Sequence, residues 1–154
     1  MKTFADLVSE QLASVEEVFP WDIEAQIQAG KTPMFLDIRE ESEFAAMRIK
    51  DSLSVPRGIL ESACEYDYEE TVPELVKARD RDIVLVCRSG NRSVLAASTL
   101  QQLGYSHVAS LKTGLRDWND YELPLVDASG ETVPLEQADD FFATRVRPDQ
   151  ENPK

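Results

Sequence analysis

Two patterns of apolar residues alternate along this chain: short continuous runs, and longer stretches with helical spacing. The runs predict buried β-strands, because a strand covered on both faces is apolar throughout. We expect these strands at 18–19, 34–38, 52–55, 83–86 and 107–111. The spaced patterns predict helices at 3–15, 21–29, 40–47, 58–65, 73–79 and 92–103. This alternation indicates an α/β fold, in which a parallel sheet carries helices on both faces.

Several predicted helices carry residues that begin or end a helix. Thr3 suits the N-cap of the first helix, and Pro73 suits the first turn of the fifth. Gly30 and Gly104 follow the second and sixth helices, where glycine commonly ends a helix. The acidic segment 65–71 is expected to be a loop.

After the last predicted strand the pattern is weaker. Residues 114–119 suit a turn or a short helix, and residues 134–143 suit one further helix. Residues 145–154 are polar, contain two prolines and are expected to fray. We therefore divide the chain into a helical extension at 1–14, one α/β domain at 15–125 and an acidic tail at 126–154.

Length and composition are those of one globular domain. The chain has 154 residues, of which 42% are hydrophobic. It has no apolar run of the ~20 residues that a membrane span needs, and no apolar signal core follows Met1. We therefore expect a cytoplasmic protein that does not bind membranes. In that compartment Cys64 and Cys87 should be free thiols, and with His107 as the single histidine no metal site is expected.

The net charge of -13 lies mostly at the two ends of the chain. Residues 1–24 hold six acidic and one basic residue, and residues 117–154 hold ten acidic and three basic residues. Residues 25–116 are left with a net charge of -1. Such acidic flanks disfavour a nucleic-acid partner. They keep the protein soluble, or alternatively they form a surface for a protein partner.

The strand at 83–86 ends in Cys87, and a polar loop and a helix follow it. In α/β sheets, ligands gather at the carboxyl ends of strands, and N–H groups at a helix start favour negative charge. We therefore expect Cys87 to react as a thiolate. Gly90 allows the loop to curl, because glycine adopts positive φ without steric cost.

Charged and hydroxyl side chains surround this cysteine in the sequence. Arg88 and Arg92 supply cationic donors for an oxyanion, and Ser89 and Ser93 supply hydroxyl groups. The alternative is a structural cysteine buried at the end of a core strand, beside arginines that face solvent.

Residues 87–93, Cys-Arg-Ser-Gly-Asn-Arg-Ser, resemble the active-site loop of single-domain rhodaneses. Three other segments occur in the order of that family: 36–40 resembles its Asp-x-Arg segment, 43–56 its Glu-Phe to Ile-Pro stretch, and 114–118 its Gly-x-x-x-Trp. The resemblance covers roughly residues 15–124. It implies a rhodanese-like three-layer fold, with a central, mainly parallel five-stranded sheet flanked by helices on both faces.

The chain departs from the family pattern at turns. Met47-Arg48-Ile49 stands where the family usually has Gly-His-Ile, and Asp51-Ser52 stands for Gly-Ala. Thr113-Gly114 replaces a pair of glycines. None of these departures lies in the cysteine loop.

The resemblance implies a sulfurtransferase. Cys87 would take the outer sulfur of thiosulfate or a related donor as a persulfide and pass it to cyanide, a thiol or a protein thiol. Loop residues Arg88, Ser89, Gly90, Asn91, Arg92 and Ser93 would hold the donor anion, without a metal or organic cofactor. Arg92 would either bind the donor or brace the loop by pairing with an acid beneath it.

Further residues have two interpretations each. Asp37 and Arg39 could tune the site, although a pair that anchors the strand end is favoured. Arg116 could lie near the loop mouth, with a solvated position as the alternative. Cys64 could resolve the persulfide as a disulfide, but its neighbours favour core packing. Trp118 is expected to be a core anchor and His107 a surface residue.

Two other functions compete with stand-alone sulfur transfer. One is a sulfur-relay or regulatory module that docks a protein through the acidic flanks. The other is a phosphatase or an arsenate-reductase-like enzyme. In the cell-cycle phosphatases that the resemblance also brings in, five residues separate the cysteine of the loop from its arginine. Here four residues separate Cys87 from Arg92. The shorter loop favours sulfur chemistry.

Overall fold

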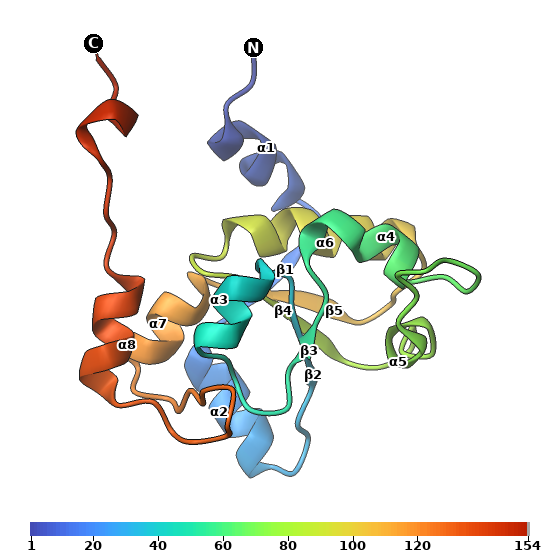
Figure 1. Ribbon diagram of the computed structural model, residues 1–154. Helices are drawn as coiled ribbons and strands as arrows, with labels where there is room; N and C mark the ends of the chain where they lie inside the picture. Colours follow the sequence, from blue (N-terminus) through green and yellow to red (C-terminus); the bar gives the residue numbers. More distant parts are fainter. Residues whose placement is uncertain (154) are drawn as a thin grey trace.

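A five-stranded sheet forms the centre of the molecule in the computed structural model, which describes residues 1–153 (Figure 1). Its strands are β1 Glu16–Val18, β2 Met34–Asp37, β3 Leu53–Ser54, β4 Ile83–Val86 and β5 Val108–Leu111. They lie in the order β1-β5-β4-β2-β3, and every strand pair in this part of the chain is parallel. The predicted α/β sheet is therefore confirmed, and β4 occupies its centre.

Helices cover both faces of the sheet. One face is covered by α1 Phe4–Gln11, α4 Leu60–Ala63, α5 Pro73–Val76 and α6 Asn91–Gln102. The other face is covered by α2 Pro20–Gln28, α7 Gly114–Asp120 and α8 Leu135–Phe142. Helix α3 Glu41–Ala46 and the 3-10 helix η1 Arg57–Ile59 lie in connecting segments, and the 3-10 helix η2 Pro148–Gln150 follows α8. No helix within residues 1–153 is long and apolar enough to cross a membrane.

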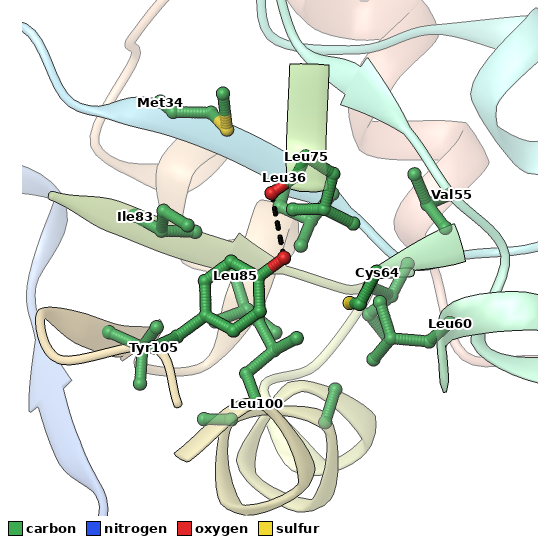
Figure 2. Packing of buried hydrophobic residues seen from close by; sticks show 14 of the residues in the cluster. Met34, Leu36, Val55, Leu60, Cys64, Leu75, Ile83, Leu85, Leu100 and Tyr105 are labelled. Atoms are coloured by element: carbon green, nitrogen blue, oxygen red, sulfur yellow. Dashed lines mark hydrogen bonds between the residues drawn. The ribbon is translucent and has the colours of Figure 1, made fainter. Parts of the chain in front are cut away.

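Alternate residues of the central strand serve the two cores. Ile83, Leu85 and Cys87 belong to the core under α6, whereas Val84 and Val86 belong to the core under α7. This follows from strand geometry, since successive side chains point to opposite faces. The side chain of Cys87 therefore points toward α6. Figure 2 shows this core, where Tyr105 Oη donates to Leu75 O at 2.7 Å.

Some helices are shorter than the apolar pattern predicts. Thr3 caps α1 as expected, accepting a hydrogen bond from Asp6 N at 3.1 Å, but the helix ends at Gln11. Val15 is still buried, because the turn after α1 carries it into the core. The helix expected at 58–65 is divided into η1 and α4, since Arg57 N donates to Ile38 O and ties the chain to the sheet.

The segment after Leu125 folds back onto the domain. The helix predicted at 134–143 is confirmed as α8, and its Ala138 and Phe142 are buried in the core under α7. Asn119 Nδ2 of α7 donates to Asp139 Oδ1 of α8 at 2.6 Å. Helix α8 is thus attached to α7 by both apolar and polar contacts. The boundaries proposed at residues 14 and 125 remain predictions.

Candidate active site

Cys87 lies at the carboxyl edge of the sheet, directly after β4. Its side chain is fully buried. The end of β2 lies alongside, with Asp37 paired in register with Val86. The nucleophile predicted from the sequence therefore follows the central strand of the sheet, which pairs with a strand on each side.

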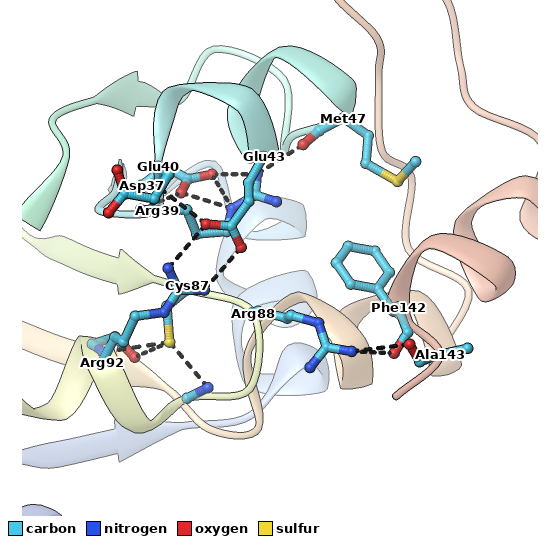
Figure 3. Close-up of polar contacts among 12 residues, drawn as sticks. Asp37, Arg39, Glu40, Glu43, Met47, Cys87, Arg88, Arg92, Phe142 and Ala143 are labelled. Atoms are coloured by element: carbon cyan, nitrogen blue, oxygen red, sulfur yellow. Dashed lines mark hydrogen bonds and ion pairs between the residues drawn. The ribbon is translucent and has the colours of Figure 1, made fainter. Parts of the chain in front are cut away.

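Hydrogen-bond donors converge on the Cys87 sulfur (Figure 3). Gly90 N donates to Sγ at 3.1 Å and Ser93 N donates to it at 3.4 Å. The Cys87 thiol donates to Ser93 Oγ at 3.3 Å, and that hydroxyl shares a 2.7 Å hydrogen bond with Ser110 Oγ. Backbone N–H groups aimed at one atom favour negative charge on it. Two backbone N–H groups of the loop thus point at one sulfur atom.

Two glycines make the loop compact. Gly90 adopts φ +87°, as the sequence suggested, and a Cβ there would lie 2.6 Å from Thr113 N. Gly114 adopts φ +62°, and a Cβ there would lie 2.5 Å from the Cys87 carbonyl oxygen. Any side chain at either position would push the loop away from the 112–114 turn.

The first turn of α7 donates hydrogen bonds to the backbone of the Cys87 loop. Leu115 N donates to Cys87 O at 3.0 Å, and Arg116 N donates to Arg88 O at 3.1 Å. These bonds satisfy N–H groups of the first helical turn, which lack partners within their own helix. The position of the nucleophile therefore depends on α7 as well as on β4.

Arg92 pairs with Glu43 of α3. Its Nη1 and Nη2 donate to Oε2 and Oε1 at 3.0 and 2.9 Å. Burial raises the pKa of Glu43, but the hydrogen bonds from Arg92 and Glu40 N and the charges of Arg92 and Arg39 outweigh it and hold that pKa below its ordinary value. The hydrogen bonds to Glu43 raise the pKa of Arg92. The geometry matches the bracing alternative for Arg92.

Arg88 reaches a partner that the sequence gave no sign of. Its Nη2 donates to Phe142 O at 2.8 Å and to Ala143 O at 3.3 Å, at the C-terminal end of α8 (Figure 3). The residue next to Cys87 is thus bound to the C-terminal end of α8.

Asp37 and Arg39 form a buried pair at the end of β2. Asp37 accepts hydrogen bonds from Arg39 Nε at 2.9 Å and from Nη2 at 2.8 Å. The same Nη2 donates to Met47 O at 2.7 Å, where α3 ends. Arg39 Nη1 is buried and has no hydrogen-bond partner within residues 1–153. The pair anchors the strand end to the α3 segment, in line with the structural interpretation.

The remaining predicted loop residues are less engaged. The side chains of Ser89 and Asn91 make no hydrogen bond within the described chain, and the N–H groups that reach the Cys87 sulfur are those of Gly90 and Ser93. Arg116 is half-buried and lines a hollow between α7 and α8 together with Asp120 and Phe142. The side chain of Arg116 thus lies close to the segment that binds Arg88.

Three other residues occupy the structural positions favoured from the sequence. Cys64 is buried in the core under α6, and this burial raises the pKa of its thiol. Trp118 is buried, meets Phe35 edge to face and donates from Nε1 to Pro124 O at 3.1 Å. His107 is exposed.

Two contributors to the site were missing from the sequence prediction. Glu43 stood in a recognised segment, but its pairing with Arg92 joins two helices, α3 and α6, that are far apart in the sequence. Ser110 had a usable signal, because it is a polar residue inside the apolar run of β5. A buried serine in such a strand needs a hydrogen-bond partner, and Ser93 supplies it.

Comparison with known proteins places these features in a family. The profile of the Rhodanese-like domain matches residues 20–121, which include the Cys87 loop and helices α6 and α7. The chain belongs to the rhodanese-like domain family. The resemblance predicted from the sequence, and the three-layer fold that it implied, are therefore confirmed.

Individual relatives agree with this assignment. The chain is 31% identical over 126 residues to a sulfurtransferase of Allochromatium vinosum, covering 82% of this chain and 94% of that protein. A rhodanese-related protein of Thermoplasma volcanium has a TM-score of 0.58 at 25% identity, covering 72% of this chain and 97% of that one.

A third similar protein bears on the alternatives. A Rhodopseudomonas palustris protein has a TM-score of 0.69 at 28% identity, covering 86% of this chain and 96% of that one. It is described as a protein of unknown function and a possible tyrosine phosphatase.

Proposed function

We propose that this protein is a sulfurtransferase that carries a sulfane sulfur as a persulfide on Cys87. The observation that carries the proposal is that Gly90 N and Ser93 N both donate to the Cys87 sulfur, whose thiol donates in turn to Ser93 Oγ. Two N–H donors aimed at one sulfur suit a reaction in which that sulfur, and then a second one attached to it, bears negative charge.

The first half-reaction is a displacement at sulfur. The Cys87 thiolate attacks the outer sulfur of thiosulfate or a related donor. The donor's S–S bond breaks, and sulfite leaves with the bonding electron pair. A persulfide anion remains on Cys87, and the loop N–H groups of residues 88–93 stabilise it. Arg116 adds positive charge near the loop for the incoming anion.

The second half-reaction reverses this pattern. The thiolate of a small thiol or a protein thiol, or cyanide in an assay, attacks the outer sulfur of the persulfide. The S–S bond on Cys87 breaks and the Cys87 thiolate is regenerated. No metal or organic cofactor takes part, and covalent transfer of this kind gives ping-pong kinetics.

The free thiols and the acidic flanks bear on the cellular compartment and on the partner of the protein. Cys64 and Cys87 are both free, which fits a reducing compartment, and we place the protein in the cytoplasm. The acidic flanks at 1–24 and 117–154 offer a surface for a protein that supplies or accepts the sulfur. In that case the chain acts as a relay module with little turnover of small molecules.

Phosphate-ester hydrolysis is the weaker candidate. It draws on the similarity to the Rhodopseudomonas palustris protein. However, four residues separate Cys87 from Arg92, and the guanidinium of Arg92 is already bound to Glu43. A short loop whose arginine is engaged leaves less room for a phosphate group.

Intact-mass measurement after thiosulfate treatment tests the proposal. Wild type should gain the mass of one sulfur atom, located on the peptide that contains Cys87, and Cys87→Ser should gain none. Cyanide should remove the added sulfur and yield thiocyanate. Hydrolysis of an aryl phosphate without any sulfur adduct would favour the phosphatase instead. An adduct without turnover on cyanide would favour the relay module.

A further inference from the structure

The nucleophile loop is bound to a helix that lies outside the matched family segment. The profile match ends at residue 121, whereas α8 spans Leu135–Phe142. Arg88 crosses this boundary, because its Nη2 donates to Phe142 O at 2.8 Å and to Ala143 O at 3.3 Å. The residue that follows the nucleophile is thus tethered to the C-terminal segment of the chain.

This tether joins two parts that are each fixed elsewhere. Helix α8 is fixed by the buried Ala138 and Phe142 and by the bond from Asn119 to Asp139. The loop backbone is fixed by α7, through the bonds that accept at Cys87 O and Arg88 O. Helices α7 and α8 pack against each other. The side chain of Arg88 therefore completes a frame of three elements around the loop.

The bonded groups suit a permanent contact. The last carbonyl groups of a helix lack partners within it and carry the negative end of the helix dipole. An arginine there satisfies two of them with one nitrogen and brings a matching charge. Arg88 was expected to orient the donor anion, but its guanidinium is held at α8 before any donor arrives.

We propose that Arg88 is a positioning residue, which ties the Cys87 loop to α8 and makes residues 135–143 part of the catalytic apparatus. The kinetic part of this inference rests on the proposed sulfur transfer. The tether itself does not. Cys87 is fully buried, so a donor reaches Sγ only when the loop moves. The bond from Arg88 to α8 limits that movement and returns the loop to one position.

The structural test uses Arg88→Met in the full chain, with Arg147→Met as the matched control. Arg147 pairs with Asp149 on the exposed tail and does not touch α8 or the loop. In Arg88→Met, amide hydrogen exchange should become faster at residues 138–143 as well as at residues 88–92. Alkylation of Cys87 should accelerate about tenfold, a size typical of a local opening.

Cys64 serves as an internal reference for this measurement. It is as deeply buried as Cys87, but it follows α4, and the hydrogen bond that its carbonyl accepts comes from Arg79 and not from the Cys87 loop. Local release of the loop should leave the alkylation rate of Cys64 unchanged, whereas general unfolding would expose both thiols together. Arg88→Lys keeps one charged donor and should restore part of the protection. Unchanged exchange at residues 138–143 in Arg88→Met would overturn the tether.

Kinetics with two donors separate positioning from anion binding. If Arg88 positions the loop, Arg88→Met lowers kcat about tenfold for thiosulfate and for a small alkyl persulfide alike, since the persulfide transfers its terminal sulfur with a thiolate as leaving group and has no sulfonate oxygens. If it binds the donor, only thiosulfate is affected, and chiefly through KM. That second result would overturn the positioning role. Inactivity of wild type toward both donors would reject the proposed sulfur transfer, while the exchange and alkylation data would still decide the tether.

Discussion

Glu43 and Arg92 join the segments that follow two neighbouring strands of the sheet. Two hydrogen bonds of 2.9 and 3.0 Å connect the carboxylate on α3 with the guanidinium on α6. Both side chains are only partly exposed, at 23% for Glu43 and 34% for Arg92. A bidentate pair fixes orientation as well as distance. Contacts therefore hold the Cys87 loop from two directions. The pair of Glu43 and Arg92 holds it from the segment after β2, and hydrogen bonds to α7 and α8 hold it from the segment after β5.

Removing this brace should weaken the fold moderately. We expect Glu43→Gln to lower the free energy of unfolding by about 1 kcal/mol at pH 7, because the pair is partly screened by solvent. Urea denaturation measures this value. The surface pair of Arg145 and Asp140 gives the control, and Asp140→Asn should change the free energy of unfolding by less than about 0.5 kcal/mol. Equal losses in the two variants would show that the brace has no special weight.

The contribution of Glu43 should also depend on pH. Its pKa is lower in the folded protein than in the unfolded chain, so the unfolded state binds the proton first as pH falls. The stabilisation is fully present above the unfolded value of about 4.3 and is lost as pH falls through the lowered folded pKa. The stability difference between wild type and Glu43→Gln should thus stay constant from pH 7 to about 5 and shrink in more acidic solution. A difference that grows on acidification would contradict this assignment.

The close approach at Gly114 gives a third prediction. A Cβ there would lie 2.5 Å from Cys87 O, so Gly114→Ala must displace the nucleophile loop. Gly30 is the matched control, since it has a similar φ of +76° but nothing within 4 Å of an added Cβ. Gly30→Ala should cost only the backbone strain, about 1 kcal/mol. Gly114→Ala should cost at least about 2 kcal/mol and most of the activity. Similar costs and equal activity in the two variants would mean that the loop tolerates displacement.

The fold was largely predictable because its signals are local. Apolar runs such as 83–86 identify buried strands. Thr3 marks the start of α1, because its hydroxyl accepts a hydrogen bond from Asp6 N only three residues away. Helix ends were less predictable. The division at residues 57–63 depends on a bond from Arg57 N to Ile38 O, which joins residues that are far apart in the chain.

Only the part of the site that lies in one short segment of the sequence could be predicted. Cys87, Gly90 and Ser93 belong to residues 87–93, and the N–H groups of Gly90 and Ser93 donate to the Cys87 sulfur. The partners of the two arginines could not be predicted, because Glu43 and Phe142 belong to distant segments. A sequence shows that an arginine needs an acceptor, but only the packed helices decide which one it meets.

Thr113 carries a strain that can be relieved. It adopts φ +56°, which is unfavourable for a β-branched residue. Its side chain is exposed and bonds only to the carbonyl of its neighbour Lys112. Thr113→Gly should therefore raise the free energy of unfolding by about 0.5 to 1 kcal/mol, the strain relieved less the added entropy of the unfolded chain. Urea denaturation checks the sign, and a lower stability would show that the Lys112 contact outweighs the strain.

The buried pair of Asp37 and Arg39 should show strong coupling. Arg39→Met removes the donors at 2.8 and 2.9 Å and leaves the Asp37 carboxylate buried without its partner, which costs about 3 to 5 kcal/mol. Asp37→Asn should cost a similar amount, because the guanidinium then loses its counter-charge. The double variant should lose less than the sum of the two single losses, by about 1 to 3 kcal/mol. Urea denaturation of all four proteins measures this coupling. Additive losses would mean that each side chain is held by its other contacts, such as the bond from Arg39 Nη2 to Met47 O, and not by the pair.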